Sequence, residues 1–228
     1  EPCDSIHCTY AEFTQHIREL LEVSDPLDVV FLGLGMQPVS RLEEIEWVPK
    51  KRYRIMGPYM PKVGRLGQRM MKQTATVQAN IDYRDEKDAM AKFRTGMGLT
   101  PILISMFANS PICDGELNGY RSYREHIWTD TDKSRSGMLK FAFAPGVSFA
   151  HYVEYALDVP MYFIIRNKNY IDMTGTTFRQ YLAYGWNGER ATLEDWHDHL
   201  TTLFPETRIK RYIEVRWAAS HPPELMPA

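Results

Sequence analysis

A ten-residue stretch of strict alternation, 74–83, constrains the fold more than any other feature of the sequence. The apolar positions are Ala75, Val77, Ala79, Ile81 and Tyr83. The intervening positions are Thr74, Thr76, Gln78, Asn80 and Asp82. Because successive side chains of a strand point to opposite faces, this pattern predicts a strand with one apolar and one polar face. One polar face is typical of antiparallel sheets, since parallel sheets are usually covered on both sides.

The composition is that of a folded domain. Of the 228 residues, 44% are hydrophobic and 25% are charged, which is enough apolar surface to form a core. The net charge of −2 argues against a protein held on nucleic acid by bulk charge. Apolar residues nowhere run uninterrupted for about 18 positions, so no transmembrane helix is expected. We therefore expect a single domain over 1–228 that binds neither nucleic acid nor membrane, with an irregular tail over 218–228.

The cysteines and the first residues bear on the cellular compartment. The three cysteines, Cys3, Cys8 and Cys113, are too few and too scattered for a disulfide framework. The first residues also lack the basic and apolar regions of a secretory signal peptide. Both observations predict a cytoplasmic protein with free thiols.

Helical and strand patterns are mixed along the rest of the chain. Helices are predicted from Thr9 onward, over 85–109 and 148–158, near Thr176 and after Thr192. Strands are predicted over 28–34 and 209–217, and a hairpin joins 161–166 to 170–173. Irregular structure is predicted over 36–51 and 110–137, the second a long loop of the kind that often carries function. Without a regular βαβ rhythm, the expected fold class is α+β with an antiparallel sheet.

The last predicted strand carries a carboxylate and a guanidinium on one face. Glu214 and Arg216 are two residues apart, which places their Cα atoms about 7 Å apart on the same side of a strand. Such a pair can hold Mg²⁺ with one group and neutralise a transferring phosphoryl with the other. A solvated polar face with a weak ion pair is the alternative, and the pattern alone favours it.

Two other segments offer hydrogen-bonding groups for a ligand. The polar face of 74–82 suits a small polar molecule, although an antiparallel sheet face open to water has the same pattern. The segment 119–132 contains Arg124, which can bind a carboxylate through two hydrogen bonds, and Trp128, which can wall a site. A surface loop with local turns is the common alternative.

Three weaker motifs complete the candidates. The Gly-containing basic segment 59–67 could meet phosphates through Lys62, but it lacks the order of a Walker A motif. His197 and His199 are two apart on a predicted helix, so their rings diverge and a solvated helix face is favoured over a metal site. Nothing in the sequence orients Cys113 against a histidine as a nucleophile.

Many literal strings of this sequence resemble the glutamate–cysteine ligases of plants and many bacteria. They are Arg52–Met56, Tyr59–Gly64, Thr76–Asn80, Phe107–Pro111, His126–Asp132, Ala156–Phe163 and Leu200–Thr202. The resemblance runs from about Cys8 to about Trp217 and therefore covers nearly the whole chain.

The resemblance implies a fold and a reaction. The fold is the catalytic fold of glutamine synthetase, in which flanking helices surround an antiparallel sheet shaped into a funnel, here present in part. The reaction is the first step of glutathione synthesis: ATP phosphorylates the γ-carboxylate of L-glutamate, and the amino group of L-cysteine then displaces the phosphate. Mg²⁺ accompanies ATP, and catalysis rests on positioning and charge neutralisation.

The resemblance also implies roles on the sheet. Glu214 matches a Mg²⁺ ligand, and Arg216 matches the catalytic arginine that faces the transferring phosphoryl. Gln78 and Asn80 lie on the strand whose counterpart lines the nucleotide–metal region and the glutamate pocket.

Further roles fall outside the sheet. Arg124 matches the arginine that binds the α-carboxylate of glutamate, and Trp128 walls that pocket. Tyr162 matches a tyrosine of the cysteine and glutamate site. Arg52 and Lys62 are expected on the phosphate side.

Members of this family are much longer than 228 residues. The chain is therefore expected to lack N-terminal metal-binding strands and a C-terminal helical part, and to turn over little by itself. Two alternatives stay open: a related γ-glutamyl ligase with another amine acceptor, and a non-catalytic domain that binds γ-glutamyl compounds. The sequence leaves the oligomeric state open.

Overall fold

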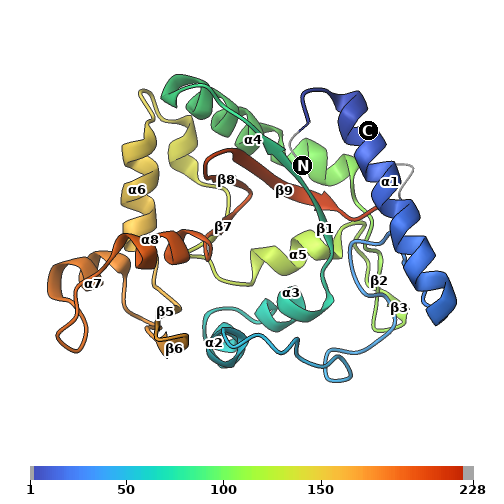
Figure 1. Cartoon of the computed structure of the whole chain (residues 1–228), viewed down its shortest axis with the longest axis horizontal. Coiled ribbons are helices and arrows are strands. Elements are labelled where there is room, and N and C mark those ends of the chain that lie inside the picture. Colours follow the sequence, from blue (N-terminus) through green and yellow to red (C-terminus); the bar gives the residue numbers. More distant parts are fainter. Residues whose placement is uncertain (1–2, 223–228) are drawn as a thin grey trace.

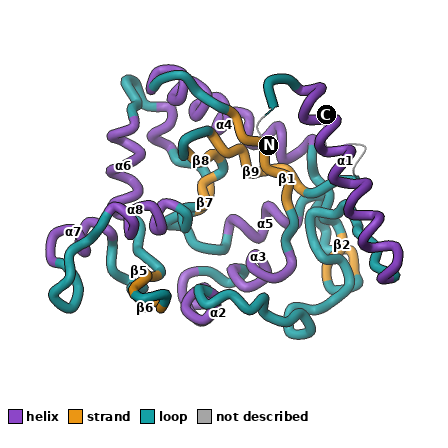
Figure 2. The backbone as a smooth tube through the Cα atoms, viewed as in Figure 1, coloured by secondary structure: helices purple, strands orange, loops and turns teal. Residues whose placement is uncertain are grey.

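A three-stranded antiparallel sheet lies at the centre of the fold. The computed structural model describes residues 3–222. The strand order is β1 (Thr76–Ile81), β9 (Ile213–Ala219) and β8 (Thr207–Ile209). In Figure 1 the helices surround this sheet, and the tube in Figure 2 shows how little of the chain is strand. Mixed helices and small antiparallel sheets confirm the predicted α+β class, and the funnel stays a prediction.

The predicted strand over 209–217 is confirmed over 213–217 and wrong over 209–212, because the chain turns back between 209 and 213. β8 ends at Ile209 and β9 begins at Ile213, and these two residues are partners across the hairpin. Directly opposed residues of a hairpin share a face, as do residues four apart in one strand. Alternation therefore cannot distinguish this three-residue turn from a continuous strand. The predicted tail is wrong at its start, since β9 includes 218 and 219, and 223–228 lie outside the described residues.

One face of the sheet is covered by α4 (Glu86–Met106), as predicted for 85–109. The side chain of Asp85 caps α4 by accepting a hydrogen bond from the Asp88 N–H at 2.9 Å. Phe93 and Met97 are fully buried and form a core with Ile213 and residues of α6 (Phe149–Asp158). Burial of this apolar surface is the main force that attaches α4 to the sheet.

The N-terminal part departs from the predictions. The first helix, α1, spans Ile6–Ser24 and is capped by Ser5, so it begins earlier than Thr9. A 3₁₀ turn, η1 (Asp25–Leu27), follows. The predicted strand over 28–34 is wrong: within the described chain this segment pairs with no strand, and Val30 is 79% exposed. An apolar run forms a strand only where a neighbouring strand accepts its backbone hydrogen bonds.

Two helices occupy a region that the sequence did not predict as helical. They are α2 (Tyr53–Val63) and α3 (Gly67–Gln73), so the segment 59–67 is not simply a basic loop. Pro58 and Pro61 lie inside α2 and argue against a helix by propensity. The buried side chains of Met56 and Met60 pack against Phe163, and this tertiary contact outweighs the propensity.

The predicted loop over 110–137 contains short elements. They are β2 (Ile112–Cys113), β3 (Glu116–Leu117), α5 (Tyr123–Thr129) and β4 (Ser136–Gly137). α5 is the important addition, because a helix places Arg124 and Trp128, four residues apart, on the same face. The long-loop prediction was therefore wrong about structure at the segment that carries two candidate residues.

The C-terminal half follows the sequence closely. Its remaining elements are η2 (Lys140–Phe143), β5 (Phe163–Arg166), β6 (Asn169–Asp172), α7 (Phe178–Tyr184), α8 (Leu193–Leu200) and β7 (Phe204–Pro205). Asn167 and Lys168 have φ values of 49° and 63°, which is the geometry of a tight hairpin turn. Thr177 and Thr192 cap α7 and α8 with reciprocal side-chain hydrogen bonds, which confirms both predicted starts. None of the helices over 3–222 is long and apolar enough to cross a membrane.

Candidate active site

A pocket of about 430 Å³ lies where α2, α3 and α5 meet the central sheet. Its charged and aromatic lining residues are Arg52, Tyr53, Arg124, Trp128, Phe204, Arg208 and Arg216. Four of these were predicted as site residues from the sequence: Arg52, Arg124, Trp128 and Arg216. They come from three separate segments, and four guanidinium groups around one pocket form a site for an anion.

Arg124 lies at the floor of this arginine pocket. It is 3% exposed, and its guanidinium donates to the backbone carbonyl oxygens of Arg216 at 3.0 Å and Trp217 at 3.4 Å. Its Nε–H is buried and has no hydrogen-bond partner within residues 3–222. Burial lowers the pKa of Arg124 from its ordinary value, because the charged form is poorly solvated. An anionic ligand would satisfy both the free donor and the charge.

Trp128 walls the same pocket one helical turn further along α5. Its ring centroid lies 5.8 Å from that of Phe204, and the Arg216 guanidinium lies 5.8 Å from the Phe204 ring. The indole N–H is buried and unpaired in the described part of the chain. Phe204 was not predicted as a site residue, and no motif in the sequence marks it. A flat apolar wall with a free N–H suits a small ligand that is partly polar.

Arg216 is anchored to the polar face of β1. Its Nη1 donates to Gln78 Oε1 at 2.9 Å, and Gln78 Nε2 donates to Asn80 Oδ1 at 2.9 Å. Burial, with the nearby Arg208, lowers the pKa of Arg216 to about 10. Gln78 and Asn80 therefore act on the pocket through Arg216 in this arrangement and do not line it themselves.

Glu214 serves as the counter-ion of three cations. Its Oε2 is held by Arg208 and lies 3.5 Å from Arg216 Nη1, and its Oε1 lies 2.9 Å from Lys210 Nζ. Burial alone would raise the pKa of Glu214, but the hydrogen bonds from Arg208 and Lys210 hold that pKa below its ordinary value. Arg208 was not singled out in the sequence, because it lies outside the Glu-x-Arg spacing.

These contacts do not fit a magnesium site. Mg²⁺ requires free carboxylate oxygens, whereas both oxygens of Glu214 already contact cations. Among residues 3–222, the donor atoms that lie close enough to share a metal belong to Cys3, Cys8 and Glu12 at the start of α1. Metal ligation by Glu214 stays a prediction from the resemblance.

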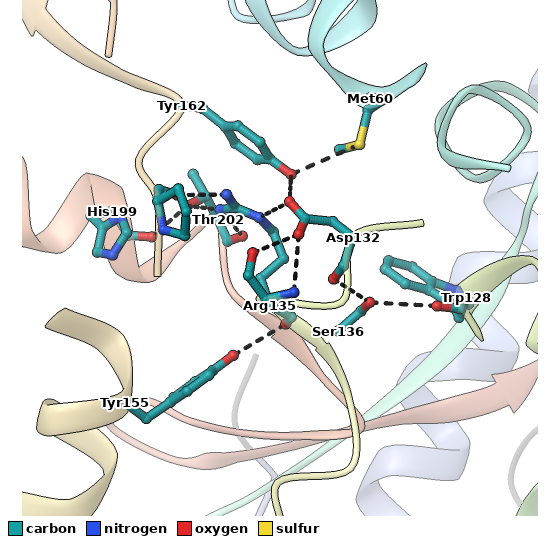
Figure 3. Close-up of polar contacts among 11 residues, drawn as sticks. Met60, Trp128, Asp132, Arg135, Ser136, Tyr155, Tyr162, His199 and Thr202 are labelled. Carbon is teal, nitrogen blue, oxygen red and sulfur yellow. Dashed lines mark hydrogen bonds and ion pairs between the residues drawn. The ribbon is translucent and has the colours of Figure 1, made fainter. Parts of the chain in front are cut away.

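Tyr162 and Lys62 do not line the arginine pocket. Lys62 lies on an exposed face in the last turn of α2. Tyr162 is 1% exposed, and Figure 3 shows its phenol pointing at Asp132 and Met60. The Arg135 guanidinium lies 3.7 Å from the centre of the Tyr162 ring. In this structure Tyr162 is part of a buried polar cluster that joins the segment after α5 to β5.

The two candidate histidines of α8 diverge, as predicted. His199 is buried, stacks on Phe178 and contacts the Ala156 carbonyl oxygen through Nε2 at 2.8 Å. His197 is exposed. Burial lowers the pKa of His199 to about 4, so the ring is neutral near pH 7. The solvated-face interpretation holds for His197, and His199 is a core residue.

The fold and the site together define an α+β protein with an arginine-lined anion pocket. Residues 1–228 match the model of glutamate-cysteine ligase family 2 (GCS2), so the chain belongs to this ligase family. It is 51% identical over 224 residues to glutamate–cysteine ligase B, chloroplastic, of Oryza sativa subsp. japonica. It is also 51% identical to the protein named glutamate–cysteine ligase, chloroplastic, of Medicago truncatula. It is 49% identical to the protein of the same name from Nicotiana tabacum.

The alignments cover 97% of this chain but less than half of each relative. The chain spans 45% of the rice protein, 44% of the Medicago protein and 43% of the tobacco protein. The predicted cytoplasmic location is contradicted, because all three relatives are named as chloroplastic. That prediction used the few cysteines and the absence of a secretory signal pattern, and few cysteines indicate a reducing environment without identifying the compartment.

Proposed function

We propose that this chain carries the glutamate-binding part of a site that joins the γ-carboxylate of L-glutamate to the amino group of L-cysteine. The observation that carries the proposal is the convergence of Arg52, Arg124 and Arg216 on one pocket. Within residues 3–222, the buried Nε atoms of Arg52 and Arg124 have no partner, so each offers a donor to a ligand carboxylate. The names of the relatives supply glutamate and cysteine as the substrates.

In the proposed chemistry, Arg124 binds the α-carboxylate of glutamate and Trp128 excludes water from one side. ATP transfers its γ-phosphoryl group to the γ-carboxylate and leaves as ADP. The cysteine amino group then attacks the acyl carbon, phosphate departs and the amine loses a proton. Arg216 neutralises negative charge that accumulates on the phosphoryl oxygens, and this is the part of the reaction where a fixed cation contributes most.

Arg52 and Lys62 are both expected on the phosphate side, but only Arg52 lines the pocket. Arg52 precedes α2 at the pocket wall and can contact a phosphate there. Lys62 lies at the far end of the same helix, ten residues on, and in this arrangement it can act only on a ligand that extends out of the pocket. Magnesium stays a prediction from the resemblance, and no residue of the pocket is assigned to it.

A second function is favoured by one observation. Both carboxylate oxygens of Glu214 contact cations, so neither is free to bind a metal ion. This arrangement favours a site that binds a ligand without metal-dependent catalysis. The chain would then bind glutamate or a γ-glutamyl compound without turnover.

Calorimetric titration of L-glutamate, followed by phosphate release from ATP, tests both functions on this chain. Glutamate binding together with phosphate release that rises on addition of L-cysteine supports the ligase. Glutamate binding without release supports the binding function. Absence of glutamate binding contradicts both. Arg179→Ala is a suitable control, because Arg179 is an exposed arginine of α7 that pairs with Glu154 and Asp158.

A further inference from the structure

Two carboxyl groups are buried behind the floor of the arginine pocket. Glu125 belongs to α5 and follows Arg124 directly, and Glu206 follows β7. The Glu125 side chain is 15% exposed and Glu206 is 9% exposed. The backbone fixes Glu206 on both sides, because its N–H donates to the Gly137 carbonyl oxygen and its own carbonyl oxygen accepts from the Arg216 N–H. Neither carboxyl group was predicted from the sequence as part of a site.

The charged neighbours of this pair are two arginines. Arg124 Nη1 lies 3.6 Å from Glu125 Oε2, and both Arg124 and Arg216 act electrostatically on Glu206. A cavity of about 10 Å³ borders Glu206 and both arginines, and it is lined by Arg124, Trp128, Phe204, Pro205, Glu206 and Arg216. This cavity has room for about one water molecule and is too small for a substrate. The carboxyl pair therefore lies beside the pocket and acts through the arginines.

The hydrogen bonding of the pair requires a proton. Glu125 Oε2 is buried and accepts no hydrogen bond from the described residues. Glu206 lies within hydrogen-bonding reach of Glu125. Two ionised carboxylates have no donor between them, whereas a protonated Glu206 can donate its O–H to the carboxylate of Glu125. Burial, and then the charge of Glu125, raise the pKa of Glu206 to about 8, which agrees with this geometry.

The proton also decides the charge of the pocket floor. If both carboxyl groups are ionised, they cancel the charges of Arg124 and Arg216. With one proton on the pair, one positive charge of the two arginines is left for a ligand. Charged ligands bind a pocket of opposite sign better, particularly where water is excluded.

We propose that Glu125 and Glu206 share one proton, and that this proton keeps the floor formed by Arg124 and Arg216 positively charged for the carboxylate of glutamate. The ligand in this inference rests on the proposed function, whereas the shared proton does not. Glu206 is a positioning residue, because it acts through Arg124 and Arg216 without touching the ligand. The proton is lost as the pH rises, so binding weakens in the alkaline range.

The shared proton is tested without any ligand by ¹³C NMR on protein labelled at the glutamate side-chain carboxyl carbon. We expect one signal that titrates near pH 8 and that disappears in Glu206→Gln and in Glu125→Gln. Glu154→Gln, at a side chain that is 65% exposed on α6, is the matched control and should retain the signal. Titration of every glutamate below about pH 6 would overturn the proposal. Two variants are used because either one alone could fail to fold.

The consequence for binding is tested by titrating L-glutamate between about pH 6.5 and pH 9.5. We expect the Kd of the unmutated chain to rise above pH 8 by up to about tenfold per pH unit, as for linkage to one proton. The Kd of Glu206→Gln should change less, because that variant cannot lose the proton. Ionisation of the glutamate amino group affects both proteins equally.

The outcomes separate this inference from the proposed function. Glutamate binding with the same pH profile in both proteins overturns the inference and leaves the proposed function standing. Titration near pH 8 by NMR, with no glutamate binding at any pH, contradicts the proposed function and confirms the shared proton.

Discussion

The guanidinium of Arg124 donates to the backbone carbonyl oxygen of Arg216 at 3.0 Å, so one arginine of the pocket fixes the strand that carries the other. The two residues are 92 positions apart in the sequence. This contact attaches α5 to β9 and leaves the Nε–H of Arg124 for a ligand, since no acceptor for it exists among residues 3–222. Structure and binding are therefore coupled at Arg124, and a test of its role needs a separate measurement of stability.

Arg124→Ala is expected to weaken L-glutamate binding by about 2 to 4 kcal/mol, because it removes a buried cation that pairs with a carboxylate. Calorimetric titration measures the change, and urea denaturation shows whether the variant is folded. Arg179→Ala should leave the affinity unchanged. An unaltered affinity in folded Arg124→Ala would remove this residue from the binding site.

Arg135→Met is expected to destabilise the fold by about 3 to 5 kcal/mol, because it leaves a buried carboxylate without its partner. Arg135 is fully buried, pairs with Asp132 at 2.6 Å and donates to the carbonyl oxygens of Thr202 and Pro160 (Figure 3). Urea denaturation measures the free energy of unfolding. The exposed Arg179→Ala should cost less than about 1 kcal/mol. A loss of similar size for both variants would contradict the role of the buried cluster.

Two glycines of α4 give a matched pair of stability predictions. A Cβ at Gly96 would lie 2.6 Å from Thr207 Oγ1 on β8, whereas at Gly98 the nearest atom is Phe143 Cε1 at 3.8 Å. We expect Gly96→Ala to destabilise by about 1 to 3 kcal/mol through overpacking. Gly98→Ala should stabilise by about 0.5 to 1 kcal/mol, because alanine favours a helix. Equal effects in thermal or urea denaturation would show that α4 does not approach β8 closely.

Stability is expected to fall in mild acid because of His199. Burial lowers its pKa in the folded state to about 4, below the ordinary value of 6.5. The unfolded chain therefore takes up a proton between about pH 6.5 and pH 4 while the folded chain does not, and stability decreases as the pH falls through that window. The loss reaches about 3 kcal/mol at the lower end.

His199→Gln should flatten this part of the pH profile, as measured by urea denaturation between pH 4 and pH 7. His197→Gln, two residues away and exposed, is the control and should keep the slope. A slope that survives in His199→Gln would assign the acid sensitivity to other groups.

Local signals were sufficient for elements with strong caps or alternation. The helical spacing over 85–109, the cap at Thr192 and the alternation over 74–83 are each local signals, and each predicted its element correctly. Prediction failed where a partner decides the structure. The apolar run at 28–34 lacks a neighbouring strand, and α2 depends on packing of Met56 and Met60.

At the candidate site, too, some residues could be predicted from the sequence and others could not. The family resemblance located Arg52, Arg124, Trp128 and Arg216, and the structure brings these four residues to one pocket. Arg208, Phe204, Glu125 and Glu206 were missed, because none of them belongs to a spacing that marks chemistry. Their importance comes from what surrounds them after folding.

The sequence by itself determined the α+β class, the family and the residue types able to bind an anion, since these depend on local periodicity and on literal strings. Only the tertiary structure decided that Glu214 is enclosed by three cations and that two carboxyl groups lie against the arginine floor. The physical reason is that charge, burial and hydrogen bonding are properties of neighbours in space. The pairing of β1 with β9 and the docking of α5 bring those neighbours together from segments about 90 or more residues apart.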